Sequence, residues 1–152
     1  MRALLTGSAP IAKEVMDFFK ICFSCDFMEG YGMTENCGAA CVTAPGDPMT
    51  GHVGGPILNF KVKLRDIPEM NYLHTNETPE GEICFYSSSV MPGYFKNPEK
   101  TAESLKNGWL HSGDVGRVLP NGSIKVIDRA KNIFKLSQGE YIAPEKLENV
   151  YV

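Results

Sequence analysis

The chain has 152 residues with a formal net charge of −3 at pH 7, and its content of 43% hydrophobic and 22% charged residues is typical of a soluble globular domain with one sizeable core. The acidic balance disfavours a nucleic-acid-binding protein, which is usually basic. No apolar run approaches the ~20 residues that cross a bilayer, and the N-terminal run is too short for a signal peptide. We therefore expect a cytoplasmic or membrane-peripheral protein with no transmembrane segment and no nucleic-acid partner.

Residues 2–28 have the order strand, turn, helix, strand. A short apolar strand (2–6) leads into the turn Gly7-Ser8-Ala9-Pro10, and apolar side chains at helical spacing predict an amphipathic helix over residues 10–22, with Pro10 in its first turn. A second strand follows over residues 23–28. This order is typical of a mostly parallel sheet, which binds ligands at the carboxyl ends of its strands. We therefore expect the turn after the first strand and the stretch after the second to line one crevice.

Residues 29–35, Glu-Gly-Tyr-Gly-Met-Thr-Glu, combine several groups that bind nucleotides. The two glycines allow tight turns and the close approach of a ligand, and Tyr31 between them can lie against a flat heterocycle. Thr34 offers a hydroxyl to a phosphate oxygen, and Glu35 offers the hard oxygen ligand that a phosphate-bound magnesium ion prefers. Taken alone, the stretch is better explained as a glycine-rich turn after a buried strand. The rest of the chain favours the ligand-binding interpretation.

Four of the five cysteines, Cys22, Cys25, Cys37 and Cys41, lie close together in the sequence, which can indicate a zinc site. The second pair, however, brackets the small-residue loop Gly38-Ala39-Ala40 without the turn of a zinc knuckle. The odd total also argues against a disulfide framework. We therefore expect buried or loop thiols rather than zinc ligands.

After residue 42 the chain is rich in turn residues and then predicts strands with period two. In the first of these strands, Phe60, Val62 and Leu64 alternate with basic residues, so one face is apolar. Asn121-Gly122 is a strong hairpin signal before the last strand. This half is typical of a small antiparallel barrel or curled sheet. The predicted strands cover residues 60–67, 81–87, 116–119 and 123–127, with an exposed loop over residues 68–80.

The last third of the chain carries two further candidate binding residues. Asp114 follows a predicted glycine turn and can accept both hydroxyls of a ribose, or it can simply cap that turn. Arg129 can donate its planar fork to ribose or phosphate oxygens. Arg129 and the lysines after it are equally consistent with a solvated charged face. A short helix is predicted to begin at Pro144.

Five motifs are spread from one end of the chain to the other: Gly7-Ser8-Ala9-Pro10; Tyr31-Gly32-Met33-Thr34-Glu35; Gly81-Glu82-Ile83 with Gly93-Tyr94; Gly108-Trp109-Leu110-His111-Ser112-Gly113-Asp114; and Asp128-Arg129-Ala130-Lys131-Asn132 running on to Lys135 and Glu145. In this order and spacing they resemble the adenylate-forming enzymes of the AMP-binding superfamily. The resemblance is closest to the long-chain acyl-CoA synthetases.

The resemblance implies an α/β fold that contains the end of a mostly parallel sheet–helix subdomain, a small antiparallel β-barrel, and the hinge and start of a small α+β C-terminal domain. Residues 1–127 would belong to the large AMP-binding domain, with an α/β crevice at 1–44 and a β-rich part at 45–127. Residues 128–152 would form the hinge and the first helix of the C-terminal domain. The family's phosphate loop and its adenylation lysine have no counterpart in this sequence. We therefore expect an internal fragment of a longer enzyme, inactive by itself.

The resemblance also implies roles for single residues. Tyr31 matches the ring that stacks on adenine, Thr34 matches the phosphate-binding hydroxyl, and Glu35 matches the magnesium ligand. Asp114 matches the ribose-binding carboxylate, and Arg129 matches a further ribose or phosphate contact. The remaining nucleotide-binding positions are Gly7, Ser8, Ala9, Pro10 and Gly32.

In the reaction that the resemblance implies, a fatty acid and ATP give acyl-AMP and pyrophosphate, and coenzyme A then displaces AMP. Mg²⁺ accompanies ATP, Thr34 and Glu35 serve the first step, and Lys135 serves the thioester-forming orientation reached by rotation at the hinge residue Asp128. Three alternatives stay open: a nucleotide-binding module without catalysis, a fragment that pairs with a larger chain, and a ligase for another carboxylic acid. The location implied is the cytoplasm or the surface of the endoplasmic reticulum or peroxisome.

Overall fold

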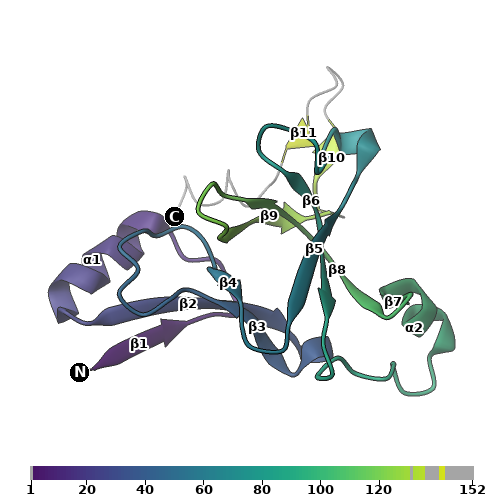
Figure 1. The fold of residues 1–152 in the computed structure, drawn as a ribbon, viewed down its shortest axis with the longest axis horizontal. Coiled ribbons are helices and arrows are strands. Elements are labelled where there is room, and N and C mark those ends of the chain that lie inside the picture. Colours follow the sequence, from purple (N-terminus) through teal and green to yellow (C-terminus); the bar gives the residue numbers. More distant parts are fainter. Residues whose placement is uncertain (1, 131, 136–140, 143–152) are drawn as a thin grey trace.

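The computed structural model describes residues 2–130, 132–135 and 141–142 (Figure 1). Within these residues two larger sheets lie side by side, with α1 beside the first and α2 at the far end of the second. The first sheet has the strand order β1-β2-β3-β4, and the second has the order β5-β6-β8-β7 with β9 paired to β8. The two sheets share one hydrophobic core, and this arrangement positions the candidate site.

The described part of the first sheet is mixed rather than mostly parallel. β1 runs parallel to β2, as the strand–helix–strand order predicts. β2 then returns through a single short 3-10 turn, Thr34–Asn36, into β3, and so short a connection permits only an antiparallel pair. β4 also pairs antiparallel with β3. The elements are β1 (Ala3–Thr6), α1 (Lys13–Phe23), β2 (Asp26–Met33), β3 (Gly38–Val42) and β4 (Gly55–Pro56).

Two segments that the sequence predicts as loops are strands. Residues 29–33 continue β2 instead of forming a glycine turn, and residues 38–40 begin β3 instead of forming a small-residue loop. Glycine and alanine are poor strand formers in isolation, but they are accepted here because the two backbones approach closely and pair along their length. The ligand-binding stretch is therefore part of a sheet.

The helix α1 is present but begins later than predicted. Its N-cap is Ala12, so Pro10 lies before the helix rather than in its first turn. Met16 is fully buried, and the ring of Phe19 packs against Phe27 of β2 with 5.9 Å between centroids. Other positions of the predicted apolar face, such as Phe18 at 60% exposure and Val15 at 43%, remain on the surface. The described residues therefore cover only a narrow stripe of the predicted apolar face.

The second sheet confirms the period-two prediction. In β5, Val62 and Leu64 are half-buried, while the basic residues that alternate with them, Lys61, Lys63 and Arg65, are exposed. The hairpin at Asn121-Gly122 is also present, with Gly122 at φ +83°. β8 is longer than predicted because Gly113 and Asp114 lie inside the strand and not in a turn before it. The elements are β5 (Lys61–Arg65), β6 (Glu80–Tyr86), α2 (Pro98–Ser104), β7 (Leu105–Lys106), β8 (Trp109–Val118) and β9 (Ile124–Arg129), with a short 3-10 helix at Pro68–Met70.

The sequence also carries local signals for α2 and for the β7–β8 hairpin. Asn97 caps α2 by accepting a hydrogen bond from the Lys100 amide at 3.0 Å, and Pro98 occupies the first helical position. Asn107 and Gly108 form the turn between β7 and β8, and both have positive φ. Asn121-Gly122 has the corresponding place between β8 and β9. These two elements matter because α2 borders the candidate site.

The core joins the two sheets. Cys41 of β3, Phe85 of β6 and Leu110 of β8 are fully buried in one cluster. Backbone hydrogen bonds of 2.8 Å link the Val53 amide to the Ile124 carbonyl and the Ile124 amide to Gly54, which ties the segment before β4 to β9. Because the sheets pack in this way, the end of β2 lies next to the middle of β8.

A third, small sheet pairs β10 (Phe134–Lys135) antiparallel to β11 (Tyr141–Ile142). The helix predicted from Pro144 lies outside the described residues, as do the side chains of Asp128 and Lys135. The division into domains at residues 127 and 128 stays a prediction. In the described part of the chain, neither helix is long and apolar enough to cross a membrane.

Candidate functional site

A cleft of about 1300 Å³ opens where the carboxyl ends of β1 and β2 meet β8, β9 and α2. The turn after β1 and the end of β2 do line one crevice, as expected from the order of elements. Ala9 and Pro10 do not line the cleft. Asp114 does not line it either, but it contacts two residues that do, Tyr31 and Arg129. The residues predicted from sequence that line the cleft are Gly7, Ser8, Tyr31, Gly32, Thr34, Glu35 and Arg129.

Tyr31 and Asp114 form one unit although they are 83 positions apart in the sequence. The Tyr31 hydroxyl donates to Oδ2 of Asp114 at 2.6 Å, and the Tyr31 ring contacts Phe85 with 5.8 Å between centroids. Burial, followed by the negative charge of Asp114, raises the pKa of the Tyr31 hydroxyl far above its ordinary value. The phenol is therefore a fixed donor, which holds the ring and the carboxylate at the same end of the cleft.

Arg129 lies opposite Asp114 in the β8–β9 ladder. Its Nε is 3.5 Å from Oδ1 of Asp114, and its side chain is 60% exposed. An ion pair this exposed contributes little to stability. The guanidinium lines the cleft, and an arginine side chain is a type of group that donates to phosphate or ribose oxygens.

Glu35 is held by a tyrosine that the sequence analysis gave no role. The Tyr94 hydroxyl donates to Oε1 of Glu35 at 2.6 Å, and the Lys100 ammonium lies 4.2 Å from the centroid of the Tyr94 ring. Tyr94 belongs to the Gly93-Tyr94 motif, but no spacing along the chain links it to a residue 59 positions away. A half-buried carboxylate at the edge of a cleft suits Mg²⁺, which prefers hard oxygen ligands and keeps several waters. Glu35 is the residue that would hold this ion.

Thr34 is the first residue of the 3-10 turn after β2, and its exposed side chain lines the cleft. The turn is fixed by the buried Asn36, whose Oδ1 accepts a hydrogen bond from the Met33 amide at 3.1 Å. The Thr34 hydroxyl is therefore presented by a rigid turn, next to Glu35.

Gly32 is required by the close approach of β3. A Cβ at this position would lie 1.7 Å from the Gly38 carbonyl oxygen and 2.9 Å from the Ala39 Cα. These contacts are with backbone, which cannot move aside as the end of a side chain can. At Gly30, in contrast, the nearest atom would be 3.7 Å away, an ordinary van der Waals distance.

We expect Gly32→Ala to lower the free energy of unfolding by about 2–3 kcal/mol, because overpacking against backbone forces the strands apart. Gly30→Ala is the matched control and should change the stability by less than about 0.5 kcal/mol. Urea denaturation of the two variants beside the unmodified chain measures both effects. Equal stabilities for the two variants would contradict the close approach at Gly32.

Glu29, at the centre of β2, is a buried carboxyl. Its side chain is 8% exposed, and Oε2 has no hydrogen-bond partner among the described residues. Burial raises the pKa of this carboxyl from 4.5 to about 7. A group with a raised pKa in the folded state contributes stability below its unfolded value of 4.5, and this stability is lost as the pH rises through about 7.

Glu29→Gln removes this pH dependence. Relative to the unmodified chain, we expect the variant to be more stable by roughly 1–2 kcal/mol at pH 8 and unchanged at pH 4, since a neutral amide needs no desolvated charge. Glu77→Gln, on an exposed loop, is the control and should show no difference at either pH. Denaturant melts at the two pH values measure the effect, and a destabilised Glu29→Gln at pH 8 would contradict it.

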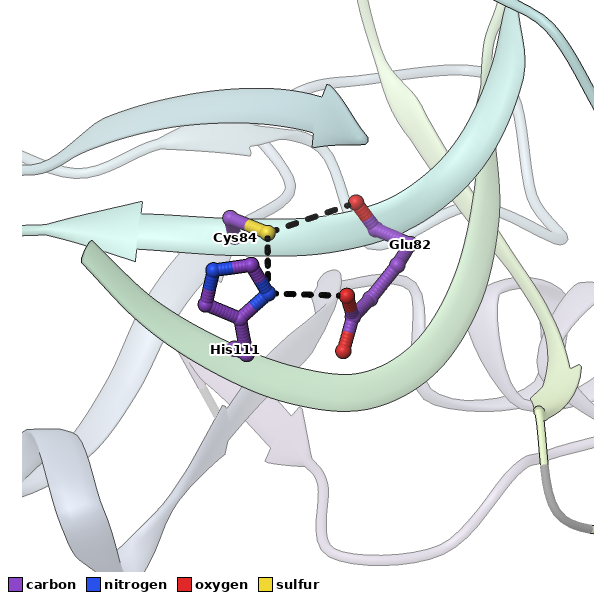
Figure 2. A group of neighbouring side chains, drawn as sticks. All are labelled: Glu82, Cys84 and His111. Atoms are coloured by element: carbon purple, nitrogen blue, oxygen red, sulfur yellow. Dashed lines mark hydrogen bonds and ion pairs between the residues drawn. The ribbon is translucent and has the colours of Figure 1, made fainter. Parts of the chain in front are cut away.

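Glu82 and His111, which line the cleft, form a cluster with Cys84 (Figure 2). The His111 Nδ1 is 2.9 Å from Oε2 of Glu82 and 3.5 Å from the Cys84 Sγ. These atoms include metal-ligand types, but Arg65 already donates to the same Glu82 oxygen at 2.6 Å. Burial and then the charge of Glu82 raise the pKa of the Cys84 thiol to about 12, which disfavours the thiolate that a metal needs. The geometry therefore favours a hydrogen-bond network over a metal centre.

The cysteines considered as zinc ligands have different environments. Cys41 is fully buried in the core, Cys25 is half-buried, and Cys22 and Cys37 are exposed. Among the described residues, the one group of three or more close metal-ligand side chains is the cluster of Figure 2, which contains none of these four thiols.

Most of the residues that line this cleft lie in a part of the chain that matches a known protein family. Residues 1–95, which include the β1 turn, the Tyr31–Glu35 stretch and Tyr94, match the family model described as AMP-binding enzyme. The chain belongs to the AMP-binding enzyme family. The family assigned from the five motifs is thus confirmed.

Curated long-chain-fatty-acid–CoA ligases align with this chain over almost all of its residues. It is 55% identical to long-chain-fatty-acid–CoA ligase 5 of Mus musculus over 99% of its length, and 52% identical to long-chain-fatty-acid–CoA ligase 1 of Homo sapiens over all of it. In both cases the chain spans 22% of the relative's own length. The chain therefore corresponds to about a fifth of an AMP-binding enzyme of this type.

A solved structure shows the same fold. The O-succinylbenzoate coenzyme A synthetase of Bacillus subtilis, in complex with the acyl-adenylate intermediate, is 28% identical and superposes with a TM-score of 0.85. The match covers 99% of this chain and 30% of that one. The same synthetase has also been solved with ATP and a magnesium ion. The mixed α/β arrangement of the AMP-binding family is therefore present here.

Proposed function

We propose that this chain supplies the nucleotide-binding part of a long-chain acyl-CoA synthetase, which activates fatty acids with ATP through an acyl-adenylate and transfers them to coenzyme A. The observation that carries the proposal is the 2.6 Å hydrogen bond between the Tyr31 hydroxyl and Asp114, with Thr34 and Glu35 on the same cleft. This contact brings two distant motifs of the family together in one site. The names and identities of the curated relatives support the long-chain substrate.

The adenosine end of ATP would be bound by Tyr31, Asp114 and Arg129. The Tyr31 ring offers an apolar face to adenine, and its hydroxyl fixes the Asp114 carboxylate beside it. A carboxylate can accept from both hydroxyls of a ribose at once. Arg129 adds a cationic fork at the same end of the cleft. Gly7, Ser8 and Gly32 also line the cleft, and because they have no side chain or a short one, a flat base can approach the backbone there.

The phosphate end would be bound next to Thr34 and Glu35. Thr34 donates its hydroxyl to a phosphate oxygen, and Glu35, oriented by Tyr94, would hold the magnesium ion. The ion, when bound, spreads the negative charge that develops on the phosphates during adenylation. The residues of the chain orient the α-phosphate toward the attacking fatty-acid carboxylate, which displaces pyrophosphate and forms acyl-AMP.

The second half-reaction would depend on the C-terminal part of the chain. Asp128, in β9, is proposed as the hinge, and Lys135, in β10, as the residue that serves the orientation in which coenzyme A displaces AMP. Rotation at a hinge is a common way to exchange catalytic faces between two steps. Membrane association and a location at the endoplasmic reticulum or peroxisome stay predictions.

A segment exchange tests the proposal. This chain would replace the matching segment of the human ligase 1 relative, and the resulting chimera would be assayed for ATP–pyrophosphate exchange with a long-chain fatty acid. We expect exchange within about tenfold of the parent, since half the residues are shared. A folded chimera that binds AMP but catalyses no exchange would overturn the proposal in favour of a nucleotide-binding module without catalysis.

A further inference from the structure

Glu82 is engaged through both of its carboxylate oxygens, although the proposed function gives it no role. Oε1 accepts a hydrogen bond from the Gly113 amide at 3.1 Å. Oε2 accepts from the Arg65 Nε at 2.6 Å and from the His111 Nδ1 at 2.9 Å, and the second of these contacts is drawn in Figure 2. Because a carboxylate only accepts, the Nδ1 of His111 carries the proton. The side chain thus links β6 to β5 and, twice, to β8.

These contacts occur where the β6–β8 ladder is interrupted. Glu82 pairs with Val115 and Cys84 with His111, so the three residues 112–114 of β8 lie opposite Ile83 alone. Gly113 adopts φ +74° within this bulge. A bulge re-aims the side chain that it carries, and here that side chain is Asp114, which reaches Tyr31 of the other sheet.

On its β9 side the bulge keeps a backbone hydrogen bond, in which the Ala130 amide donates to the Gly113 carbonyl at 2.8 Å. On its β6 side, where the register shifts, side-chain hydrogen bonds substitute for a regular ladder. The Ser112 hydroxyl donates to the Ile83 carbonyl at 2.7 Å and accepts from the Asp114 amide at 3.0 Å. The Gly113 amide has Glu82 as its acceptor. Of these substitutes, the bond to Glu82 joins a buried charge to the residue directly before Asp114, and a charge-assisted bond is about twice as strong as a neutral one.

We propose that Glu82 is a positioning residue of the nucleotide site, which fixes the bulge at Gly113 and thereby places the Asp114 carboxylate for the ribose. The inference rests on the proposed function, in which Asp114 binds the ribose hydroxyls. His111 and Arg65 act through Glu82 by fixing the orientation of its carboxylate.

The electrostatics of the network agree with this role. Burial raises the pKa of Glu82, but the hydrogen bonds from His111 and Arg65 outweigh burial and hold it below the ordinary value of 4.5. Glu82 is therefore ionised at neutral pH and offers two fixed acceptors. A protonated carboxyl would lose one acceptor and with it a partner of the bulge.

The experiment measures how the chimera discriminates ATP from 2′-deoxy-ATP, as the ratio of kcat/KM values in pyrophosphate exchange. Loss of one ribose hydroxyl should cost the parental chimera about tenfold. We expect Glu82→Gln to lower this preference at least threefold, because the ribose acceptor is displaced. A merely structural defect would lower both values equally. Glu80→Gln, on the same strand and paired with Arg117 outside the cleft, is the matched control and should leave the ratio unchanged.

Variants of His111 keep the test decisive if Glu82→Gln does not fold. His111→Ala removes the donor to Glu82 and should also lower the ratio, whereas His111→Asn places an N–H near the position of Nδ1 and should restore it. The inference is overturned if Glu82→Gln leaves the ratio of kcat/KM values for ATP and 2′-deoxy-ATP unchanged. If Glu82→Gln does not fold, an unchanged ratio in His111→Ala overturns it. Tight binding of Zn²⁺ that is lost in Cys84→Ser would also overturn it, in favour of a metal centre.

Asp114→Asn separates this inference from the proposed function. If Asp114→Asn abolishes the preference for ATP over 2′-deoxy-ATP and Glu82→Gln does not affect it, only the positioning role of Glu82 is wrong. If Asp114→Asn leaves the preference unchanged, Asp114 does not bind the ribose, and the proposed nucleotide site is itself wrong.

Discussion

Asp114→Asn in the chimera is expected to lower kcat/KM for ATP in pyrophosphate exchange by about 10²- to 10³-fold. The carboxylate would accept from two ribose hydroxyls, and each hydrogen bond to a charged group contributes about 1.5–3 kcal/mol. The amide keeps the shape of the side chain but loses the charge and one acceptor. It also weakens the bond from the Tyr31 hydroxyl, which is 2.6 Å long in the present structure. The Tyr31 ring, which we propose stacks on adenine, would therefore be loosened together with the proposed ribose contact.

The matched control is Asp66→Asn. Asp66 is also a hydrogen-bonded aspartate, since it accepts from the His74 amide at 2.8 Å, but it lies on an exposed loop and does not line the cleft. Its replacement should leave kcat/KM within about twofold. A loss of less than tenfold in Asp114→Asn, with the fold intact by thermal unfolding, would contradict a ribose contact at this position.

Glu35→Gln is expected to lower kcat for pyrophosphate exchange by about 10³-fold while leaving the Kd of AMP within about threefold. The proposed role of Glu35 is to hold the magnesium ion, whose effect is greatest on the charge that develops on the phosphates in the transition state. AMP lacks the β- and γ-phosphates, so its binding depends little on this carboxylate. Glutamine still accepts the hydrogen bond from Tyr94, so the turn that carries it should stay in place.

Two further variants serve as a partial-loss comparison and a control for Glu35→Gln. Tyr94→Phe removes the hydrogen bond to Glu35 but not the charge, and we expect a loss of about tenfold that excess Mg²⁺ partly restores. Glu99→Gln, on α2 and outside the lining of the cleft, should have no effect on exchange. A parallel fall in AMP affinity and kcat for Glu35→Gln would show that the carboxylate supports the fold of the site rather than the ion.

Much of the local structure could be predicted from the sequence because it depends on neighbouring residues. The alternation of apolar and basic side chains around Val62 predicts β5, and Asn121-Gly122 predicts the β8–β9 hairpin. The same reasoning would have found the hairpin at Asn107-Gly108 and the capped start of α2 at Asn97. These signals act over a few residues, and tertiary contacts did not override them.

The glycines of β2 show where local reasoning fails. Gly30 and Gly32 are best explained in isolation as turn residues, yet both lie in a strand. Gly32 is there because the Gly38 carbonyl leaves no room for a Cβ, and that contact is a property of the β2–β3 pair and not of the stretch itself. The position of Asp114 inside β8 has the same kind of cause, since it depends on the pairing of β8 with β6 and β9.

The family, and the chemical groups that can bind a nucleotide, follow from the sequence, because recognising five motifs in order requires no knowledge of distances. How these groups act together depends on contacts that form only in the folded chain. Tyr31 holds Asp114 across 83 positions of sequence, Tyr94 orients Glu35, and Glu82 supports a bulge in β8. No periodicity or spacing predicts such contacts, because hydrogen bonds between segments far apart in the sequence are fixed by how the strands pair and pack and not by the order of residues along the chain.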